Sequence, residues 1–178
     1  MGDNNATTRI VRWNVLPHPE RLHDAIDAIF FEASNTKTFA DDDTRRQFRH
    51  RWLGRYLRDY PQWSYLAMAD ADDALAGYLV GAVDEPTAFE DFIAAAQRFP
   101  AHLHVNLAPQ FRSRGIGALL IDAFAADAAR SGAPGMHVVT SSDARNVRFY
   151  HRAGFSPQAT TLVNGHELVF LGRPLLDR

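Results

Sequence analysis

The 178-residue sequence contains no cysteine, which excludes disulfide bridges, a thiolate nucleophile and cysteine-ligated zinc or iron–sulfur centres. It also has no uninterrupted apolar run near the ~20 residues that a membrane-spanning helix needs. Its first residues lack the basic region and apolar stretch of a secretory signal. We therefore expect an intracellular protein with a cytoplasmic location.

Neither sign of charge dominates, since 19 Lys and Arg residues stand against 21 Asp and Glu residues and the formal net charge is -2. This balance excludes a whole-protein field that would attract nucleic acid or an anionic membrane, so we expect neither as a partner. The densest basic run lies on one predicted helix and comprises Arg45, Arg46, Arg49, Arg51, Arg55 and Arg58. A solvated helix face is the favoured interpretation of such a run, and contact with an anionic ligand is the alternative.

The rest of the composition is that of a packed globular protein, with 46% hydrophobic, 11% aromatic and 22% charged residues. The length suits one domain of ordinary size, and the sequence contains no repeat or linker that would divide it. We expect a single domain over residues 1–178, in which residues 1–8 form a flexible N-terminus.

The spacing of apolar residues predicts the order of strands and helices. Strands are predicted at residues 9–16, 63–69, 75–83, 101–108, 136–140, 160–164 and 168–172. Helices are predicted at residues 19–31, 44–60, 116–131 and 146–153, with a short extra helix that begins at a Thr87/Glu90 capping box. Asn164-Gly165 is a two-residue hairpin signal. This order predicts an α/β (α+β) fold with a mixed, twisted central sheet of about seven strands flanked by helices.

The most informative segment is Pro-Gln-Phe-Arg-Ser-Arg-Gly-Ile-Gly at residues 109–117, between a predicted strand and a predicted helix. Gly115 and Gly117 allow a ligand close to the backbone, and the first N–H groups of a helix can bind phosphate. A dinucleotide fingerprint is a competing interpretation, but Leu120 stands where its third glycine belongs. The Gly-Lys-Ser/Thr of a P-loop is also absent. A phosphate-binding turn and a purely structural Gly-x-Gly turn remain as alternatives.

This segment resembles the acetyl-CoA turn of the GCN5-related N-acetyltransferases, whose Gln/Arg-x-x-Gly-x-Gly/Ala pattern matches Arg112-x-x-Gly115-x-Gly117. Residues 146–155 are similar to the family's Asn-x-x-x-x-Phe-Tyr-x-x-x-Gly-Phe segment, with a difference in spacing. The resemblance covers residues 101–155. It implies an acyl-CoA N-acyltransferase fold, acetyl-CoA as co-substrate, and direct attack of a primary amine on the acetyl group. We expect no metal, because none of the eight histidines forms a His-x-x-x-His pair beside a carboxylate on a clear helix face.

The resemblance also implies a cofactor site in which strand 101–108 splays from strand 136–140. Backbone groups left unpaired by the splay would bind the pantetheine arm as another strand would. The amides of residues 112–118 would hold the pyrophosphate. The implied cofactor-binding residues are Val105, Leu107, Arg112, Ser113, Arg114, Gly115, Ile116, Gly117, Ala118, Asn146 and Phe149.

Tyr150 matches the family's general-acid tyrosine, and a phenol with a pKa of about 10 can protonate a departing thiolate. A core tyrosine with a satisfied hydroxyl is the alternative interpretation. For the general base we prefer His104 to His102, which lies on the same polar strand face, because imidazole titrates near pH ~6.5. Hydrogen-bonded structural histidines are the alternative, and Asp84 and Glu85 are reserve candidates.

The sequence leaves two classes of function open, an N-acetyltransferase and a noncatalytic acyl-CoA-binding or protein-interaction domain. The acceptor amine can belong to a small molecule or to a peptide. An exposed edge of the last hairpin would favour a homodimer. Ordinary packing is the favoured interpretation of four aromatic residues that can alternatively line an acceptor pocket: Trp52, Tyr56, Trp63 and Tyr65.

Overall fold

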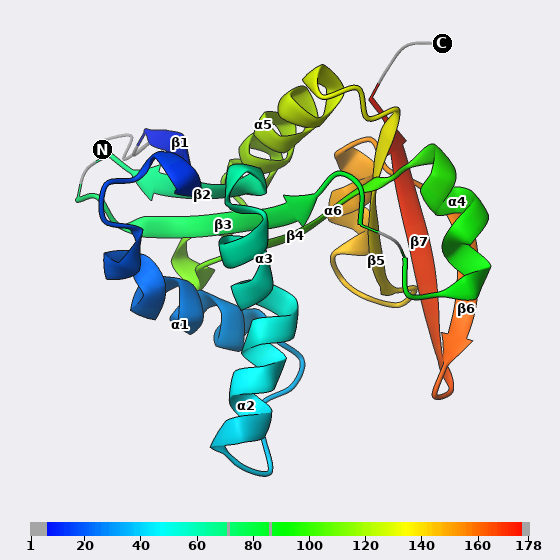
Figure 1. Cartoon of the computed structure of the whole chain (residues 1–178), viewed down its shortest axis with the longest axis horizontal. Coiled ribbons are helices and arrows are strands. Elements are labelled where there is room, and N and C mark those ends of the chain that lie inside the picture. Colours follow the sequence, from blue (N-terminus) through cyan, green and yellow to red (C-terminus); the bar gives the residue numbers. More distant parts are fainter. Residues whose placement is uncertain (1–6, 71, 86, 176–178) are drawn as a thin grey trace. The chain divides into compact units, whose positions relative to one another are not determined.

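The computed structural model describes residues 7–70, 72–85 and 87–175 (Figure 1). The strands are β1 (Thr8–Arg12), β2 (Ser64–Ala69), β3 (Leu75–Ala82), β4 (Ala101–Leu107), β5 (Gly135–Ser141), β6 (Ser156–Val163) and β7 (His166–Pro174). The helices are α1 (His23–Ala33), α2 (Asp42–Arg49), α3 (Arg55–Asp59), α4 (Ile93–Arg98), α5 (Ile116–Arg130) and α6 (Val147–Arg152). The seven strands form an open mixed sheet in the order β1-β2-β3-β4-β5-β7-β6, so the predicted fold class is confirmed.

The chain forms two compact units that share β3, β4 and α5 along the sequence. Unit 1 comprises Met1–Val80 and Val105–Ala123, and unit 2 comprises Gly81–His104 and Phe124–Arg178. Most of the flexible N-terminus expected at residues 1–8 lies outside the described residues, and Thr8 already belongs to β1.

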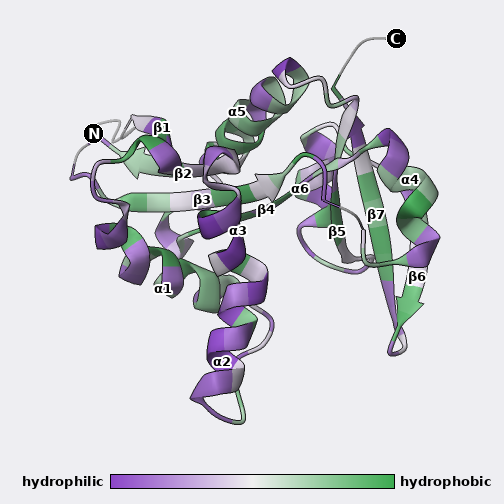
Figure 2. Cartoon of the chain, viewed as in Figure 1, coloured by the Kyte–Doolittle hydropathy of each residue, from purple (hydrophilic) through white to green (hydrophobic). Residues whose placement is uncertain are grey.

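Unit 1 is built on the antiparallel strands β1, β2 and β3. Every residue of β2 is buried, and α1 contributes Ile26, Ile29 and Phe30 to the core at helical spacing. Helix α2 is mostly hydrophilic (Figure 2) and is tied to α1 by Arg49, whose Nε lies 2.7 and 2.8 Å from the two carboxylate oxygens of Asp27. Nη2 of Arg49 also lies 2.6 Å from Oδ1 of Asp27, and this contact of two guanidinium nitrogens with one carboxylate orients α2 without requiring a large apolar face on it.

The helix predicted at residues 44–60 is interrupted by a π-helical turn, His50–Gly54. A π turn adds about one residue to a helical turn, so the position that follows Phe48 on the inner face is five residues on and not four. Leu53 is accordingly fully buried, whereas Trp52 is 39% exposed. Of the aromatic residues expected to pack ordinarily, Tyr56 therefore lies in the core, whereas Trp52 does not.

Unit 2 contains the antiparallel strands β5, β7 and β6, with β4 pairing in parallel with β5. Helix α4 packs on this part of the sheet (Figure 1), where Phe92 and Phe99 contact Phe170 of β7. The Phe99 ring fits there because two neighbouring strand positions are glycine. A Cβ atom added at Gly135 would lie 2.5 Å from the Phe99 ring, and one added at Gly172 would lie 2.8 Å from it.

Replacing Gly172 with alanine is expected to lower the free energy of unfolding by about 1–3 kcal/mol, because the new methyl group overpacks the core against Phe99. Urea denaturation measures the change. Leu162→Ala on the neighbouring strand is the control, because Leu162 is 74% exposed and its loss should alter stability by no more than about 0.5 kcal/mol. Equal stability of the Gly172→Ala variant and the wild type would contradict the packing described here.

The hairpin predicted at Asn164-Gly165 is confirmed, with φ values of 50° and 78° and antiparallel pairing of β6 with β7. Two further expectations are wrong. Strand β1 ends at Arg12, because Trp13 turns into a short 3-10 segment and stacks on His23 with ring centroids 5.5 Å apart. Thr87 does not form a capping box, since its hydroxyl accepts from the amide of Phe89 and the following turn begins without a side-chain cap.

Candidate active site

The turn before α5 lies in unit 1 and exposes a row of backbone donors. After the 3-10 segment Pro109–Phe111, Ser113 and Gly115 adopt left-handed φ values of 62° and 79°. In the described part of the chain, the N–H groups from Ser113 to Gly117 have no protein acceptor, and the first bonds of the helix start at Ala118 and Leu119. These amides stand at the start of the 15-residue helix α5, the end of a helix at which backbone N–H groups can bind an anion.

Gly115 leaves this turn open on one side. A Cβ added there would meet no atom within 4 Å, and the left-handed φ favours glycine in any case. The space is therefore available to a ligand.

Arg112 already has two protein partners within unit 1. Its Nε donates to the carbonyl oxygen of Leu107 at 3.1 Å, and its Nη2 forms an ion pair with Glu32 at the end of α1. This pair connects α1 to the turn although the two residues are 80 positions apart. The Arg114 side chain lies over the ring of Phe111, with its guanidinium carbon 5.6 Å from the ring centroid.

The segment of β4 that leads to the turn also belongs to unit 1. Val105 and Leu107 are half-buried, and Leu107 packs where Gly77 of β3 leaves room, since a Cβ at Gly77 would lie 2.3 Å from it. The amide of Ala108 donates to the carbonyl of Ala76 at 2.9 Å, which holds the end of β4 on β3.

In unit 2, β4 and β5 pair only where they begin. Their register covers Ala101↔Met136 and His102↔His137, and no further pair follows along the described residues of either strand. The end of β5 is instead connected to α6, because the Thr140 hydroxyl donates to Asn146 Oδ1 at 3.1 Å. Asn146 precedes α6 and is exposed.

Tyr150 is held by the backbone around α6. Gly154 adopts a left-handed φ of 88°, and the amide of Phe155 bonds back to the carbonyl of Tyr150 at 3.0 Å, which closes a Schellman-type helix end. Phe155 and Phe149 then contact the tyrosine ring, with centroid distances of 5.6 and 5.2 Å. The Phe-Tyr-x-x-x-Gly-Phe pattern thus has a physical basis in positioning Tyr150.

The Tyr150 hydroxyl differs from that of an ordinary core tyrosine. The side chain is 6% exposed, and within the described chain its hydroxyl makes no hydrogen bond. No fully buried side-chain oxygen among the described residues lacks a partner, so this hydroxyl must retain contact with solvent. Burial of the ring raises the pKa of Tyr150 to about 12, which keeps the phenol protonated at neutral pH. It is an unengaged proton donor.

The predicted base candidates belong to a group of imidazoles in unit 2. His104 is half-buried, and its ring lies 5.9 Å from that of His102. Nε2 of His102 lies 3.0 Å from Oε2 of Glu85, a residue held in reserve from the sequence. His137 of β5, which sequence reasoning did not single out, is buried. Its ring centroid lies 5.6 Å from that of His102, and its ring stacks on Phe170. Asp84 is exposed.

Burial lowers the pKa of His137 to about 4, with repulsion by His102 as a smaller cause, although the hydrogen bond of its Nδ1 to the Phe99 carbonyl at 2.5 Å acts in the opposite direction. Between pH 6.5 and about 4 the unfolded chain therefore binds a proton that the folded protein does not, and stability falls as the pH falls.

We expect this window to cost up to about 3 kcal/mol of unfolding free energy, and replacing His137 with glutamine to remove that slope. Urea unfolding of both proteins at pH 7.0, 5.5 and 4.5 measures it. An unchanged pH dependence in the His137→Gln variant would show that the imidazole is not buried in its neutral form.

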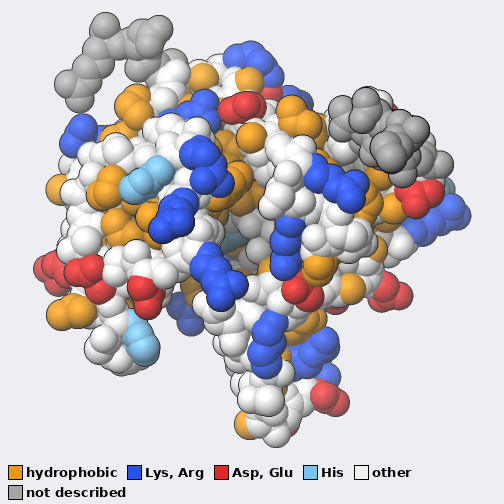
Figure 3. All heavy atoms as spheres, turned by 180° about the vertical axis from the view of Figure 1, so that it is seen from behind, with side chains coloured by type: hydrophobic (Ala, Val, Ile, Leu, Met, Phe, Trp, Pro, Cys, Tyr) orange, Lys and Arg blue, Asp and Glu red, His pale blue; other side chains and the backbone are white. Residues whose placement is uncertain are grey.

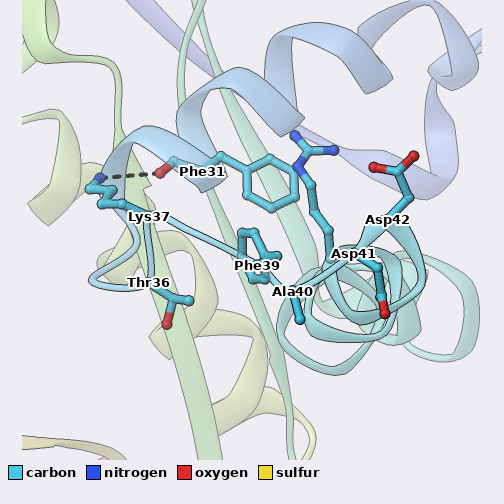
Figure 4. Close-up of a pocket in the computed structure, with 8 residues that line it drawn as sticks. Phe31, Thr36, Lys37, Phe39, Ala40, Asp41 and Asp42 are labelled. Carbon is cyan, nitrogen blue, oxygen red and sulfur yellow. Dashed lines mark hydrogen bonds between the residues drawn. The ribbon is translucent and has the colours of Figure 1, made fainter.

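Unit 1 also contains a cavity of about 490 Å³ between the end of α1 and the start of α2 (Figure 4). The rings of Phe31 and Phe39 meet edge to face at 6.0 Å, and the Arg45 guanidinium lies 3.7 Å above Phe31. Lys37 Nζ donates to the Phe31 carbonyl at 3.2 Å. Asp42 lines the cavity with a carboxylate. The cavity therefore offers aromatic surface and charges of both signs.

Among the remaining arginines of the run, Arg46, Arg51 and Arg58 are exposed and Arg55 is half-buried, and part of this basic surface is seen on α2 in Figure 3. Arg46 and Arg58 pair with the neighbouring carboxylates of Asp43 and Asp59. Arg51 lies over the ring of Trp52 at 5.1 Å. These local contacts support the interpretation of the run as a solvated face.

No three His, Asp or Glu side chains among residues 7–70, 72–85 and 87–175 are arranged to hold a metal ion. Over the same residues, no helix is both long and apolar enough to cross a membrane.

An open mixed sheet with an amide-lined turn between β4 and α5 defines the acyl-CoA N-acyltransferase class of folds. The sequence profile of the acetyltransferase (GNAT) family matches residues 20–155. Because this match covers more than half of the chain, the protein belongs to the GNAT acetyltransferase family. The resemblance seen in the sequence is thereby confirmed.

Solved structures share this fold. SsHAT superposes with a TM-score of 0.73 at 19% identity, covering 96% of this chain and 100% of its own. The structure of the acetyltransferase-type protein yncA from Salmonella typhimurium, with its cofactor acetyl-CoA, superposes with a TM-score of 0.65 at 19% identity. The match covers 97% of this chain and 96% of yncA. A chain of the NatC complex bound to Gag peptide and CoA superposes with a TM-score of 0.67 at 13% identity. The match covers 95% of this chain and 99% of that one.

Proposed function

We propose that this protein transfers the acetyl group of acetyl-CoA to a primary amine by direct attack. The observation that carries the proposal is the row of unpartnered amides from Ser113 to Gly117 at the start of α5. A pyrophosphate needs several hydrogen-bond donors, and consecutive amides without a protein acceptor at a helix start support this turn as its site. Family membership and the acetyl-CoA bound to yncA support the same choice of donor.

The remaining cofactor contacts follow the family resemblance. The backbone of Val105 and Leu107 would bind the pantetheine amides, and Asn146 and Phe149 would contact the same arm. The short pairing of β4 with β5 supports this arrangement, because strand residues beyond the paired region can bond to a ligand. Arg112 would bind the phosphates only if its guanidinium exchanged the ion pair with Glu32 for a contact with a phosphate oxygen.

The chemistry requires a neutral amine, a thioester carbonyl to attack, and a proton for the departing sulfur. Acetyl-CoA, when bound, supplies the thioester. We assign the proton donor to Tyr150, because its hydroxyl is unengaged and stays protonated at neutral pH. The base is a histidine of β4, for which the sequence favours His104.

The experiment is thiol release from acetyl-CoA in the presence of a panel of amines: n-butylamine, lysine, spermidine, kanamycin and a short peptide with a free N-terminus. We expect at least one of them to stimulate release of free CoA, with the acetylated amine found by mass spectrometry. Binding of acetyl-CoA without transfer to any of these amines would favour the noncatalytic acyl-CoA-binding alternative.

A further inference from the structure

Arg112, in the turn before α5, is joined to Glu32 near the end of α1, and both residues belong to unit 1. Nη2 of Arg112 forms an ion pair with a carboxylate oxygen of Glu32, and Nε donates to the carbonyl oxygen of Leu107 at 3.1 Å. The two charged side chains are 44% and 43% exposed, so the pair lies at the surface. A phosphate-bearing ligand can therefore reach it.

These two contacts occupy one edge of the guanidinium group. The N–H of Nε and one N–H of Nη2 point in the same direction, and together they form the fork that binds two oxygens of a carboxylate or a phosphate. Here the first of them is bonded to the Leu107 carbonyl and the second contacts Glu32. A phosphate that used this edge of Arg112 would have to displace the carboxylate of Glu32.

The backbone of Glu32 is held in place independently of the ion pair. Lys37 Nζ donates to the carbonyl oxygens of Phe31 and Glu32, at 3.2 Å in the case of Phe31. The Glu32 carboxylate therefore extends from a fixed point of the backbone within reach of Arg112. An exposed ion pair is weak mainly because two long side chains must be ordered to form it, and a fixed starting point lowers that cost.

The competing partner of Arg112 would bind at the amides that follow it in the sequence. The N–H groups from Ser113 to Gly117 have no protein acceptor in the described part of the chain. A pyrophosphate on these amides would lie beside Arg112 and would carry more negative charge than one carboxylate. The guanidinium would then move from Glu32 to a phosphate oxygen, and breaking the ion pair would cost part of the free energy of binding.

We propose that Glu32 is an autoinhibitory residue of the cofactor site, which competes with the CoA phosphates for Arg112 and so lowers the affinity for acetyl-CoA. This inference rests on the proposed function, because it takes acetyl-CoA as the ligand of the turn. No covalent bond changes in this step. The ion pair of Arg112 with Glu32 is exchanged for an ion pair of Arg112 with a phosphate.

Calorimetric titration of the Glu32→Gln variant with acetyl-CoA tests the proposal, since the substitution keeps the shape of the side chain and removes its charge. At low ionic strength we expect acetyl-CoA to bind about three- to fivefold more tightly than to the wild type, which is the range that an exposed ion pair supplies. The gain should shrink as salt is added, because salt screens exposed charges.

Asp24→Asn is the matched control, because it removes one negative charge from an exposed position of the same helix. Its affinity for acetyl-CoA should equal that of the wild type.

A double-mutant cycle separates competition for Arg112 from simple repulsion between Glu32 and the phosphates. Arg112→Gln is expected to weaken acetyl-CoA binding. Adding Glu32→Gln to this variant should then change the affinity less than about 1.5-fold, because no guanidinium is left to be released.

Three results would overturn the inference. The first is an unchanged affinity in Glu32→Gln, and the second is a weaker affinity, which would mean that Glu32 orients Arg112 for the phosphate. The third is the same gain with and without Arg112, which would mean that Glu32 acts by repulsion alone. Failure of the wild type to bind acetyl-CoA would instead refute the proposed function, so the two failures are distinguishable.

Discussion

Replacing Tyr150 with phenylalanine is expected to lower kcat about 100-fold or more while changing the affinity for acetyl-CoA less than about threefold. The substitution removes one oxygen from a side chain whose hydroxyl makes no hydrogen bond in the described structure. Packing against Phe149 and Phe155 is preserved, so the fold should lose little stability. Stopped-flow or steady-state thiol release, beside calorimetric binding, separates the two effects.

Tyr56→Phe is the matched control for this prediction. Tyr56 is also buried, but its hydroxyl accepts a hydrogen bond from Arg55 Nη2 at 2.7 Å. Its loss should lower stability by about 1 kcal/mol and leave kcat unchanged. If Tyr150→Phe kept full activity, the sulfur would leave without this proton donor, and Tyr150 would be a packing residue.

Replacing Gly117 with aspartate is expected to weaken acetyl-CoA binding more than about 100-fold, because a carboxylate about 4 Å from a phosphate costs several kcal/mol in a partly shielded site. The new carboxylate would also compete for the free amides of the turn. Isothermal titration calorimetry measures the affinity, with circular dichroism melting as the check on folding.

Two further variants complete this test. Gly117 is buried, whereas Ser113 is exposed and already left-handed, so Ser113→Asp adds the charge at little cost to the fold. Ala126→Asp adds the same charge at an exposed position in the middle of α5, and its affinity should equal that of the wild type. Full affinity in both turn variants would mean that the pyrophosphate binds elsewhere.

Local patterns predicted much of the fold. The Asn164-Gly165 turn, the helix that ends at Gly132 and the strand that leads into the Gly115 turn each depend on residues close together in sequence. The turn's chemistry was predictable for the same reason, since unpaired amides follow from the start of a helix.

Features that depend on distant residues were not predictable. The π turn at His50–Gly54 shifts a helical face by one position, and its only trace in the sequence is the spacing from Phe48 to Leu53. The ion pair of Arg112 with Glu32 and the contact of His102 with Glu85 join residues that lie far apart in the sequence and meet only in the folded chain. In the sequence, each of these four residues resembles an ordinary charged or polar surface residue, so nothing indicates its partner.

The most direct measurement of the central claim is calorimetric titration of the wild-type protein with acetyl-CoA, CoA and NADH. The account predicts saturable binding of both CoA compounds and no binding of NADH, because the turn lacks the third glycine of a dinucleotide site. No heat of binding with either CoA compound up to about 1 mM, where even a site of about -4 kcal/mol is half occupied, would contradict it.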